Sequence, residues 1–152
     1  MSELHMRIVP MNRRHLLACE DIVWSSDPWK RYREGVDFKA AMRRKQAYVL
    51  TIADAVAGFV VFDPEPVFAR GGYLRALGVS PAIRGSGIGR ALLAFAESRT
   101  ARKAANLYLC VSSFNGKARK FYRTCGYEQV GRIDGLVKKG TAELIMRKRL
   151  RK

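Results

Sequence analysis

Acidic residues, cysteines and long hydrophobic runs are scarce or missing in this chain of 152 residues. No apolar stretch approaches the ~18 residues that a membrane-spanning helix requires. The sequence MSELHMRIVP at the N-terminus lacks the basic and then apolar pattern of a secretory leader. The three cysteines, Cys19, Cys110 and Cys125, have neither metal-ligand nor disulfide-framework spacing. We therefore expect a cytoplasmic protein that binds no membrane and no metal.

The shortage of acidic residues gives the chain a strong positive charge. Only 13 Asp and Glu residues face 29 Lys and Arg residues, so that the formal net charge is +16. Such a charge favours phosphate-bearing ligands or polyanions, including nucleic acid, although a generally basic and solvated surface would look the same. The length suits one domain, residues 1–152, with a single hydrophobic core.

Hydrophobic periodicity and turn residues predict an alternation of strands and helices. Strands are expected at residues 6–11, 47–52, 57–62, 73–79, 106–113, 128–133 and 142–148. Helices are expected to follow Asn12, Asp37, Gly87 and Asn115. Between the third and fourth strands, the sequence DPEPVFARGG (residues 63–72) contains two prolines and is expected to form a loop.

The stretch IRGSGIGRALL (residues 83–93) places glycines at three alternate positions before a helical pattern. It has neither the Gly-Lys-Ser/Thr ending of a P-loop nor the spacing of a dinucleotide fingerprint. A loop of small residues at a helix N-terminus exposes backbone N–H groups where the helix dipole is positive, and it can bind phosphate. Arg84 and Arg90 flank the loop and add positive charge. A turn that merely caps the helix is the alternative.

Together with the preceding strand YLRALGVSP and with Asn115, Ala118 and FYRTCGY (residues 121–127) downstream, this stretch resembles the GCN5-related N-acetyltransferase (GNAT) family. Members of this family transfer an acyl group from acyl-coenzyme A to an amine. The resemblance implies a mixed α/β (α+β) fold. Its central sheet would be mostly antiparallel, with six to seven strands and about four flanking helices, in the order β-α-α-β-β-β-α-β-α-β-β. It also implies that two parallel strands, ending near Val79 and Ser113, separate to admit the cofactor.

Within the family, the chain resembles in particular the enzymes that acetylate the N-terminal alanine of a ribosomal protein. The shared features are Pro28 and Trp29 after the first helix and the run GRALL (residues 89–93). One residue departs from the pattern, because Cys110 stands where those enzymes carry a glutamate proposed as the base.

The resemblance also implies which residues bind acetyl-CoA. Backbone groups of residues 77–79 and the Asn115 side chain would contact the pantetheine, and residues 85–90 would hold the pyrophosphate. The implied cofactor-binding residues are Leu77, Gly78, Val79, Arg84, Gly85, Ser86, Gly87, Ile88, Gly89, Arg90 and Asn115. Tyr122 is the candidate catalytic residue, as proton donor to the leaving thiolate. Its alternative role is that of a core aromatic on an apolar helix face.

The general base stays open. The candidates are acidic residues of loops and of the last strand, or a water held by two serines: Asp63, Glu65, Glu34, Asp37, Glu143, and Ser112 with Ser113. Deprotonation at pH 7 costs about 4.6 kcal/mol for a lysine-like amine of pKa 10.4, but only about 1.1 kcal/mol for an α-amine of pKa 7.8. A site without a strong base therefore favours an α-amine.

These observations predict an N-acetyltransferase that moves an acetyl group from acetyl-CoA directly to a primary amine. The acceptor would be a small anionic metabolite or a protein N-terminus, because the positive charge repels polycationic amines. Two alternatives remain: a non-catalytic acyl-CoA-binding sensor or interaction module, and a basic nucleic-acid-binding protein. Nucleic acid, the ribosome and a second copy of the chain are open as partners.

Overall fold

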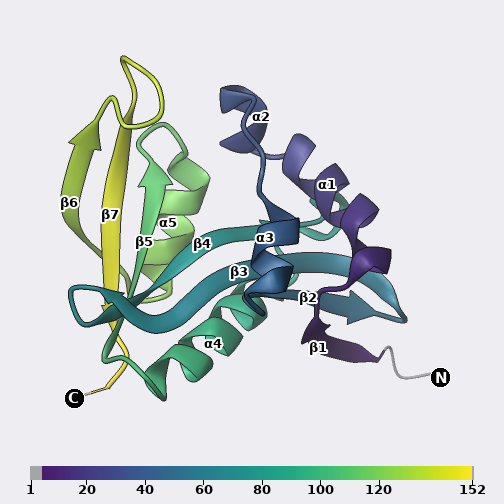
Figure 1. The fold of residues 1–152 in the computed structure, drawn as a ribbon. Helices are drawn as coiled ribbons and strands as arrows, with labels where there is room; N and C mark the ends of the chain where they lie inside the picture. Colours follow the sequence, from purple (N-terminus) through teal and green to yellow (C-terminus); the bar gives the residue numbers. More distant parts are fainter. Residues whose placement is uncertain (1–4, 152) are drawn as a thin grey trace. The chain divides into compact units, whose positions relative to one another are not determined.

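The computed structural model describes residues 5–151 and contains a sheet flanked by helices (Figure 1). In chain order the elements are β1 (Met6–Pro10), the 3-10 helix η1 (Arg13–His15), α1 (Leu16–Trp24), α2 (Trp29–Tyr32), α3 (Phe38–Arg43), β2 (Ala47–Ile52), β3 (Ala55–Phe68), β4 (Gly71–Val79), the 3-10 helix η2 (Pro81–Ile83), α4 (Ile88–Ala101), β5 (Asn106–Ser112), α5 (Gly116–Thr124), β6 (Glu128–Asp134) and β7 (Ala142–Arg149). Within this described part, seven strands form one sheet in the order β1-β2-β3-β4-β5-β7-β6. The β4–β5 pair is parallel, whereas β1–β2, β2–β3, β5–β7 and β6–β7 are antiparallel. The predicted mixed sheet is therefore confirmed.

The described residues divide into two compact units that alternate along the sequence. Unit 1 comprises the described residues up to Phe62 together with Ala76–Phe95. Unit 2 comprises Asp63–Arg75 and the described residues from Ala96 onward. The strands β3 and β4 and the helix α4 each contribute to both units. That residues 1–152 form one domain stays a prediction.

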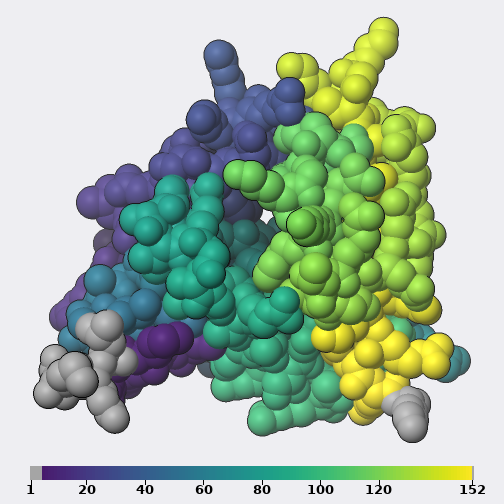
Figure 2. Space-filling view, turned by 180° about the vertical axis from the view of Figure 1, so that it is seen from behind, coloured from purple at the N-terminus to yellow at the C-terminus, as the bar shows by residue number. Residues whose placement is uncertain are grey.

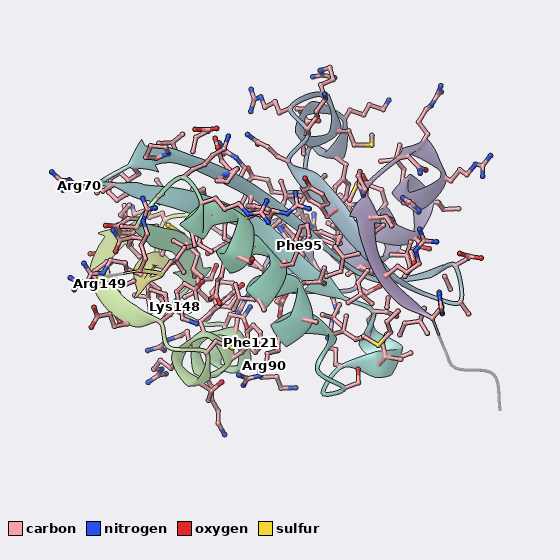
Figure 3. All side chains as sticks on the ribbon, turned by 90° about the horizontal axis from the view of Figure 1, so that it is seen from below. Arg70, Arg90, Phe95, Phe121, Lys148 and Arg149 are labelled. Atoms are coloured by element: carbon pink, nitrogen blue, oxygen red, sulfur yellow. The ribbon has the colours of Figure 1, made fainter. Side chains whose placement is uncertain are left out.

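Unit 1 is a layer of strands with helices on both faces. One face buries Val49 of β2 and Phe59 of β3 in a cluster with Val23 of α1 and Phe38 of α3. Side chains alternate across a strand, so Tyr48 points to the other face. There its ring lies 4.8 Å from that of Phe95 in α4, which is labelled in Figure 3. Both faces of this part of the sheet are therefore covered.

Local signals in the sequence explain where several elements of unit 1 begin and end. Asn12 caps η1, since its side chain accepts a hydrogen bond from the Arg14 N–H at 2.9 Å. Asp37 caps α3 in the same way through the Ala40 N–H at 3.0 Å. Ala53 and Asp54 join β2 to β3 with φ angles of 50° and 65°. Two consecutive residues with positive φ form the tight turn that the right-handed twist of a hairpin favours.

Unit 2 is built on three neighbouring strands, β5, β7 and β6. The antiparallel register of β5 and β7 pairs Cys110 with Ile145 and Ser112 with Glu143. The parallel ladder between β4 and β5 runs from the pair Gly71 and Asn106 to the pair Leu74 and Leu109. The helix α5 follows β5, and its end is marked by Gly126 with a φ of 97°.

Residues 63–72, expected as a loop, are the clearest error of the sequence analysis. The strand β3 continues through Phe68, so that both prolines lie within it. The Phe62 N–H donates to the Gln46 carbonyl at 3.1 Å, and β2 has no register pair beyond Ala47 with Val61. In an extended strand, positions 64 and 66 point their backbone nitrogen to the same side as Phe62. The prolines therefore lack an N–H only where the neighbouring strand has already ended.

The helix count also differs from the expected order. Two helices were expected between the first two strands, but the structure has three α-helices there besides η1, because α2 forms one turn at Trp29–Tyr32. The Tyr32 N–H donates to the Pro28 carbonyl at 2.9 Å, and Arg33 ends the turn with a φ of 56°. Proline is tolerated at the start of a helix because no N–H is required there. In the described part of the chain, no helix is both long enough and apolar enough to cross a membrane.

Candidate functional site

The glycine-rich loop leads from η2 into α4 and lies in unit 1. Gly85 and Gly87 have φ angles of 84° and 87°, a backbone conformation that residues with a side chain rarely adopt. A Cβ atom added at either position would meet no atom within 4 Å, so the space above the loop is open. In Figure 2 the teal segment that contains the loop lies at the surface. The glycines are thus required by the backbone conformation, and they leave room for a bulky group to approach it.

The start of α4 supplies hydrogen-bond donors beside this open space. The first intrahelical bond runs from the Ala91 N–H to the Gly87 carbonyl at 3.0 Å. The backbone N–H groups of the residues before Ala91 belong to the first turn of the helix. In the first turn, N–H groups have no carbonyl partner within the helix. Ser86 stabilises the loop by donating its hydroxyl to the Ile83 carbonyl. Arg90, in the first turn, is exposed, and Figure 3 labels it. The arrangement can hold an anion such as a phosphate.

Arg84 serves the loop in a way that the sequence analysis did not foresee. Its Nη2 donates to the Ser26 hydroxyl at 2.7 Å, and its Nε lies 3.4 Å from the Val79 carbonyl oxygen. Ser26 is buried and in turn donates to the Ile22 carbonyl at 2.5 Å. The guanidinium therefore connects the loop to the end of α1 and to the end of β4. Ser26 was missed because nothing in the local sequence links it to a residue so far along the chain.

The end of β4, residues 77–79, is shaped by close packing at Gly78. A Cβ atom there would lie 2.5 Å from Cε1 and 2.7 Å from Cζ of Phe59. Leu77 and Val79 are half-buried, whereas Gly78 is buried. The Ser80 N–H donates to the Ala57 carbonyl at 2.8 Å, which fixes the end of the strand against β3. These residues have a defined backbone, and their predicted contacts to a pantetheine stay a prediction.

Asn115 begins α5 in unit 2. Its Oδ1 accepts a hydrogen bond from the Ala118 N–H at 3.3 Å, which makes it the N-cap of the helix. Its backbone N–H donates to the Ser112 carbonyl at 2.9 Å. With Oδ1 used for the cap, the side-chain NH2 group is the part of Asn115 that can donate to a ligand.

Tyr122 lies on the buried side of α5. Its ring packs edge-on against those of Phe121 and Tyr127, with centroid distances of 5.2 and 5.8 Å. Burial raises the pKa of Tyr122 above its ordinary value, and the neighbouring Cys125 contributes in the same direction. The phenol is therefore neutral at physiological pH and able to donate a hydrogen bond. The structure thus assigns the ring a packing role, which is compatible with a catalytic role for the hydroxyl.

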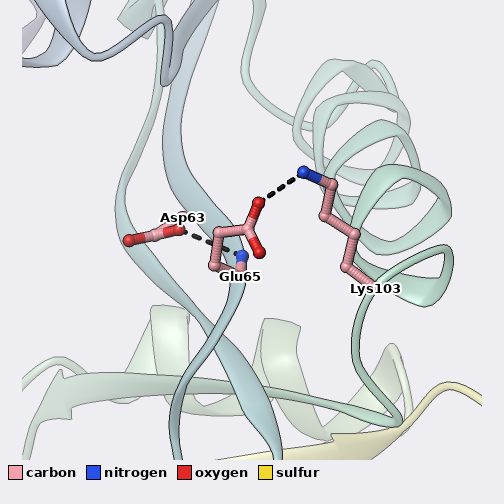
Figure 4. A network of polar contacts seen from close by, with 3 residues as sticks. All are labelled: Asp63, Glu65 and Lys103. Atoms are coloured by element: carbon pink, nitrogen blue, oxygen red, sulfur yellow. Dashed lines mark hydrogen bonds and ion pairs between the residues drawn. The ribbon is translucent and has the colours of Figure 1, made fainter.

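Four of the five acidic candidates for the base have other partners or lie exposed. In unit 2 the Asp63 carboxylate accepts the Glu65 N–H at 3.0 Å, and Glu65 forms an ion pair with Lys103 (Figure 4). In unit 1 Glu34 is exposed, and the Asp37 carboxylate caps α3.

Glu143 of β7 is a buried carboxylate, as is Asp63. Its Oε1 accepts a hydrogen bond from the Ser112 hydroxyl at 3.2 Å. Its charge contributes to raising the pKa of both Tyr73 and Cys110, although burial is the largest cause for each. Tyr73 and Cys110 are also joined by a side-chain hydrogen bond. The sequence alone did not point to Tyr73, because only the register of β4 and β5 brings it beside Cys110.

One known protein family matches most of the chain. A family model described as the acetyltransferase (GNAT) family matches residues 14–127, well over half of the chain. The chain belongs to the GNAT acetyltransferase family. No curated protein sequence gives a significant match.

Solved GNAT structures share the fold over almost the whole length. A GNAT-family acetyltransferase from Bacillus cereus superposes with a TM-score of 0.75 at 18% identity, covering 95% of this chain and 97% of that one. The ribosomal-protein-S18-alanine N-acetyltransferase of Escherichia coli gives 0.76 at 19% identity, covering 97% and 96%. Naa50 of Arabidopsis thaliana, in complex with the bisubstrate analogue CoA-Ac-MVNAL, gives 0.73 at 20% identity, covering 94% and 97%. At these identities the likeness shows the fold alone.

Membership of the GNAT family implies acetyl transfer from acetyl-CoA. The glycine loop fits this cosubstrate, since the open space at Gly85 and Gly87 and the donors of the α4 start suit a pyrophosphate. Among residues 5–151, no group of three or more His, Cys, Asp or Glu side chains could hold a metal ion. The candidate residues fall into two sets: residues 77–79 and 84–90 in unit 1, and Asn115 and Tyr122 in unit 2.

Proposed function

We propose that this GNAT acetyltransferase is a cytoplasmic N-acetyltransferase that transfers the acetyl group of acetyl-CoA directly to a primary amine. The observation that carries the proposal is the open glycine loop at the start of α4. The acceptor is a small anionic metabolite or the N-terminus of a protein, as the net charge of +16 and the low cost of deprotonating an α-amine suggest. Two structural neighbours support a protein terminus: one is an alanine N-acetyltransferase, and the other binds a peptide bisubstrate analogue.

Different residues bind the cosubstrate and take part in the chemistry. Backbone N–H groups of residues 85–90, with Arg90, bind the pyrophosphate, and Arg84 holds the loop in place through Ser26. Backbone groups of residues 77–79 and the Asn115 NH2 group bind the pantetheine. Tyr122 donates a hydrogen bond to the sulfur as the carbon–sulfur bond breaks.

Two rival functions make different predictions. A non-catalytic acyl-CoA-binding module would bind acetyl-CoA but acetylate nothing, and Cys110 in place of a glutamate is the observation in its favour. A nucleic-acid-binding protein would rely on the basic surface and would lose affinity steeply as salt rises. Only a preference for a particular sequence or structure would favour it over the non-specific attraction that any basic protein shows.

Cofactor binding is tested first by thermal unfolding with acetyl-CoA, using wild type, Gly87→Glu and Gly87→Ala. A non-glycine residue at a φ of 87° costs about 1–2 kcal/mol in both variants, so alanine is the control for backbone strain. Acetyl-CoA at a hundredfold excess over Kd should stabilise the wild type by about 2.7 kcal/mol. Gly87→Glu, which puts a carboxylate at the phosphate position, should lose this gain far more than Gly87→Ala. Equal stabilisation of all three proteins would contradict the assigned loop.

The acceptor is tested with peptides and small amines at pH 7. One peptide has a free N-terminal alanine and no lysine, and a second has a blocked N-terminus and one lysine. The cost of deprotonation alone favours the α-amine by about 3.5 kcal/mol, which is about 400-fold. Spermidine serves as the polycationic control. Acetylation of spermidine as efficiently as of an anionic amine would contradict the charge argument, and binding without any acetylation would favour the sensor.

A further inference from the structure

The end of β3 carries an aromatic ring that is exposed and yet held in a defined position. Phe68 is the last residue of β3, lies in unit 2 and is 52% exposed. Its ring meets that of Tyr108 in β5 edge-on, with centroids 5.0 Å apart and ring planes at 80°. A single exposed aromatic residue is common on protein surfaces. What distinguishes Phe68 is the way its ring is held and the charges around it.

Tyr108 forms a rigid support for the Phe68 ring. A Cβ atom at Gly71 would overlap with Cδ2 and Cε2 of Tyr108, so this glycine leaves room for the Tyr108 ring to lie over the start of β4. The Tyr108 hydroxyl donates to the Ala69 carbonyl at 3.1 Å, and the residue is only 7% exposed. Ala69 and Arg70, with φ angles of 42° and 61°, form a tight turn. A ligand that stacks on Phe68 therefore meets a ring that is already ordered.

Two exposed arginines lie at the same end of these strands. The Asn106 side chain donates through Nδ2 to the Arg70 carbonyl at 3.3 Å, and Asn106 is the register partner of Arg149. Side chains alternate along a strand, so Arg149 points to the same face of the sheet as Tyr108. Arg70 and Arg149 are both labelled in Figure 3. Within residues 5–151, neither guanidinium forms a hydrogen bond or an ion pair, so both are available to a ligand.

The acidic residues of the neighbouring strands do not cancel this charge. Glu128 of β6 binds the Arg147 guanidinium at 2.7 Å, and Arg147 is the register partner of Tyr108. Glu65 of β3 is paired with Lys103 (Figure 4). Each of these carboxylates is thus neutralised by its own cation. The positive charge of Arg70 and Arg149 stays uncompensated beside the exposed ring.

An exposed aromatic ring with free arginines around it suits a single-stranded nucleic acid. In such sites cations follow the phosphate backbone, and unpaired bases stack on aromatic side chains. The planar guanidinium group matches the geometry of phosphate oxygens. A second copy of this chain would bring a further net charge of +16 against the same surface, which disfavours self-association. An acidic peptide would satisfy the arginines, but its carboxylates offer no planar ring to stack on Phe68.

We propose that Phe68, Arg70 and Arg149 form a binding surface for single-stranded nucleic acid. One base stacks on the Phe68 ring, and backbone phosphates bind the two guanidinium groups. This surface shares no residue with the proposed acetyl-CoA site, so it adds a second binding activity to the proposed acetyl transfer and does not depend on it.

The test measures the binding of a fluorescein-labelled oligouridylate of about 12 nucleotides, within the usual site sizes for single strands, by fluorescence anisotropy. Phe68→Ala should raise Kd about 5- to 150-fold, the effect of losing one stacked base, and leave the salt dependence unchanged. The double variant Arg70→Ala, Arg149→Ala should instead make the slope of log K against log salt shallower by about 1.4, or 0.7 for each lost phosphate contact.

Two control variants match these changes. Val67→Ala truncates an equally exposed neighbour that points to the opposite face of β3, and it should leave Kd within about twofold of wild type. Arg44→Ala removes one exposed arginine of unit 1 and should leave the slope unchanged. A reduction of the slope by Arg44→Ala equal to half that of the double variant would indicate general attraction to a basic surface and would overturn the inference.

Further measurements separate stacking from folding and from other partners. If Phe68→Ala does not fold, Phe68→Leu keeps an apolar contact with Tyr108 but lacks the ring, and it should show the same loss. With an RNA duplex of the same length, Phe68→Ala should have no effect, because paired bases cannot stack on the ring.

Several results would overturn the inference. They are a Kd of the folded Phe68 variant within twofold of wild type, displacement of the oligonucleotide by acetyl-CoA, binding of an oligoglutamate that depends equally on Phe68, and self-association that depends on Phe68. Displacement by acetyl-CoA would place the nucleic acid at the glycine loop instead. A wild type that binds the oligonucleotide but acetylates no amine would contradict the proposed function and leave this surface assigned.

Discussion

Replacing Tyr122 by phenylalanine removes one hydroxyl and leaves the buried ring in place. The ring contacts with Phe121 and Tyr127 do not involve the hydroxyl, so we expect the free energy of unfolding to change by less than about 1 kcal/mol. A folded variant with the same melting temperature then isolates the chemistry of the phenol.

The pKa of Tyr122 limits what this hydroxyl can do. Complete proton transfer from a phenol of pKa 10 to a thiolate whose thiol has a pKa near 8.5 is uphill by about 2 kcal/mol. Burial raises the pKa of Tyr122 further, which makes complete transfer costlier. We therefore expect the phenol to act as a hydrogen-bond donor to the leaving sulfur. A hydrogen bond to a charged group contributes about 1.5–3 kcal/mol, so Tyr122→Phe should lower kcat about 10- to 150-fold.

The assay follows the release of the free coenzyme A thiol at saturating acetyl-CoA and acceptor. We expect kcat to fall while the stabilisation by acetyl-CoA is unchanged. Because the pKa of Tyr122 is raised, the wild-type rate should show no decline from its ionisation below about pH 10. An unchanged kcat in Tyr122→Phe would refute the catalytic role. A large drop in melting temperature would indicate that the hydroxyl stabilises the core.

Three further predictions concern stability and reactivity. Gly78→Ala should destabilise the protein by about 1–3 kcal/mol in a denaturant titration, since its Cβ would lie 2.5 Å from the buried Phe59 ring. Cys19 should resist a thiol reagent in the native state at pH 8, because burial raises its pKa to about 12. Mapping of the modified peptides measures the extent of reaction. The free energy of unfolding should fall above about pH 10, because the pKa values of Tyr122 and Tyr127 are raised in the fold. The unfolded chain then loses the phenol protons at a lower pH than the folded chain does. Unfolding followed by circular dichroism at a series of pH values checks this.

Local signals in the sequence predicted much of the fold. Asn12, Asp37 and Asn115 were expected to begin helices, and each caps one in the structure. The short connection between the strands expected at residues 47–52 and 57–62 is a tight turn at Ala53 and Asp54. These features depend on a few consecutive residues, because caps and tight turns are set by local hydrogen bonds and by φ. Caps and tight turns can therefore be predicted from short stretches of sequence.

Features that depend on distant residues could not be predicted in this way. Whether Pro64 interrupts a strand depends on where the neighbouring strand β2 ends, and the local sequence does not contain that information. The bond between Arg84 and Ser26 joins residues 58 positions apart. The cluster of Tyr73 with Glu143 needs the register of β4 with β5 and of β5 with β7 together. The sequence therefore gave a set of candidate bases but not which of them lie side by side.

The two sets of candidate residues should separate cosubstrate binding from turnover. The proposed phosphate-binding loop lies wholly in unit 1, whereas Tyr122, the proposed hydrogen-bond donor to the leaving sulfur, lies in unit 2. A defect in the loop weakens the binding of the pyrophosphate. Because this binding contributes equally to the ground state and the transition state, the defect should raise the KM for acetyl-CoA. Loss of the Tyr122 hydroxyl should affect the transition state alone and lower kcat. A loop variant that lowered kcat at saturating acetyl-CoA would mean that the loop also positions the thioester, which would make Arg84 and its bond to Ser26 part of the catalytic geometry.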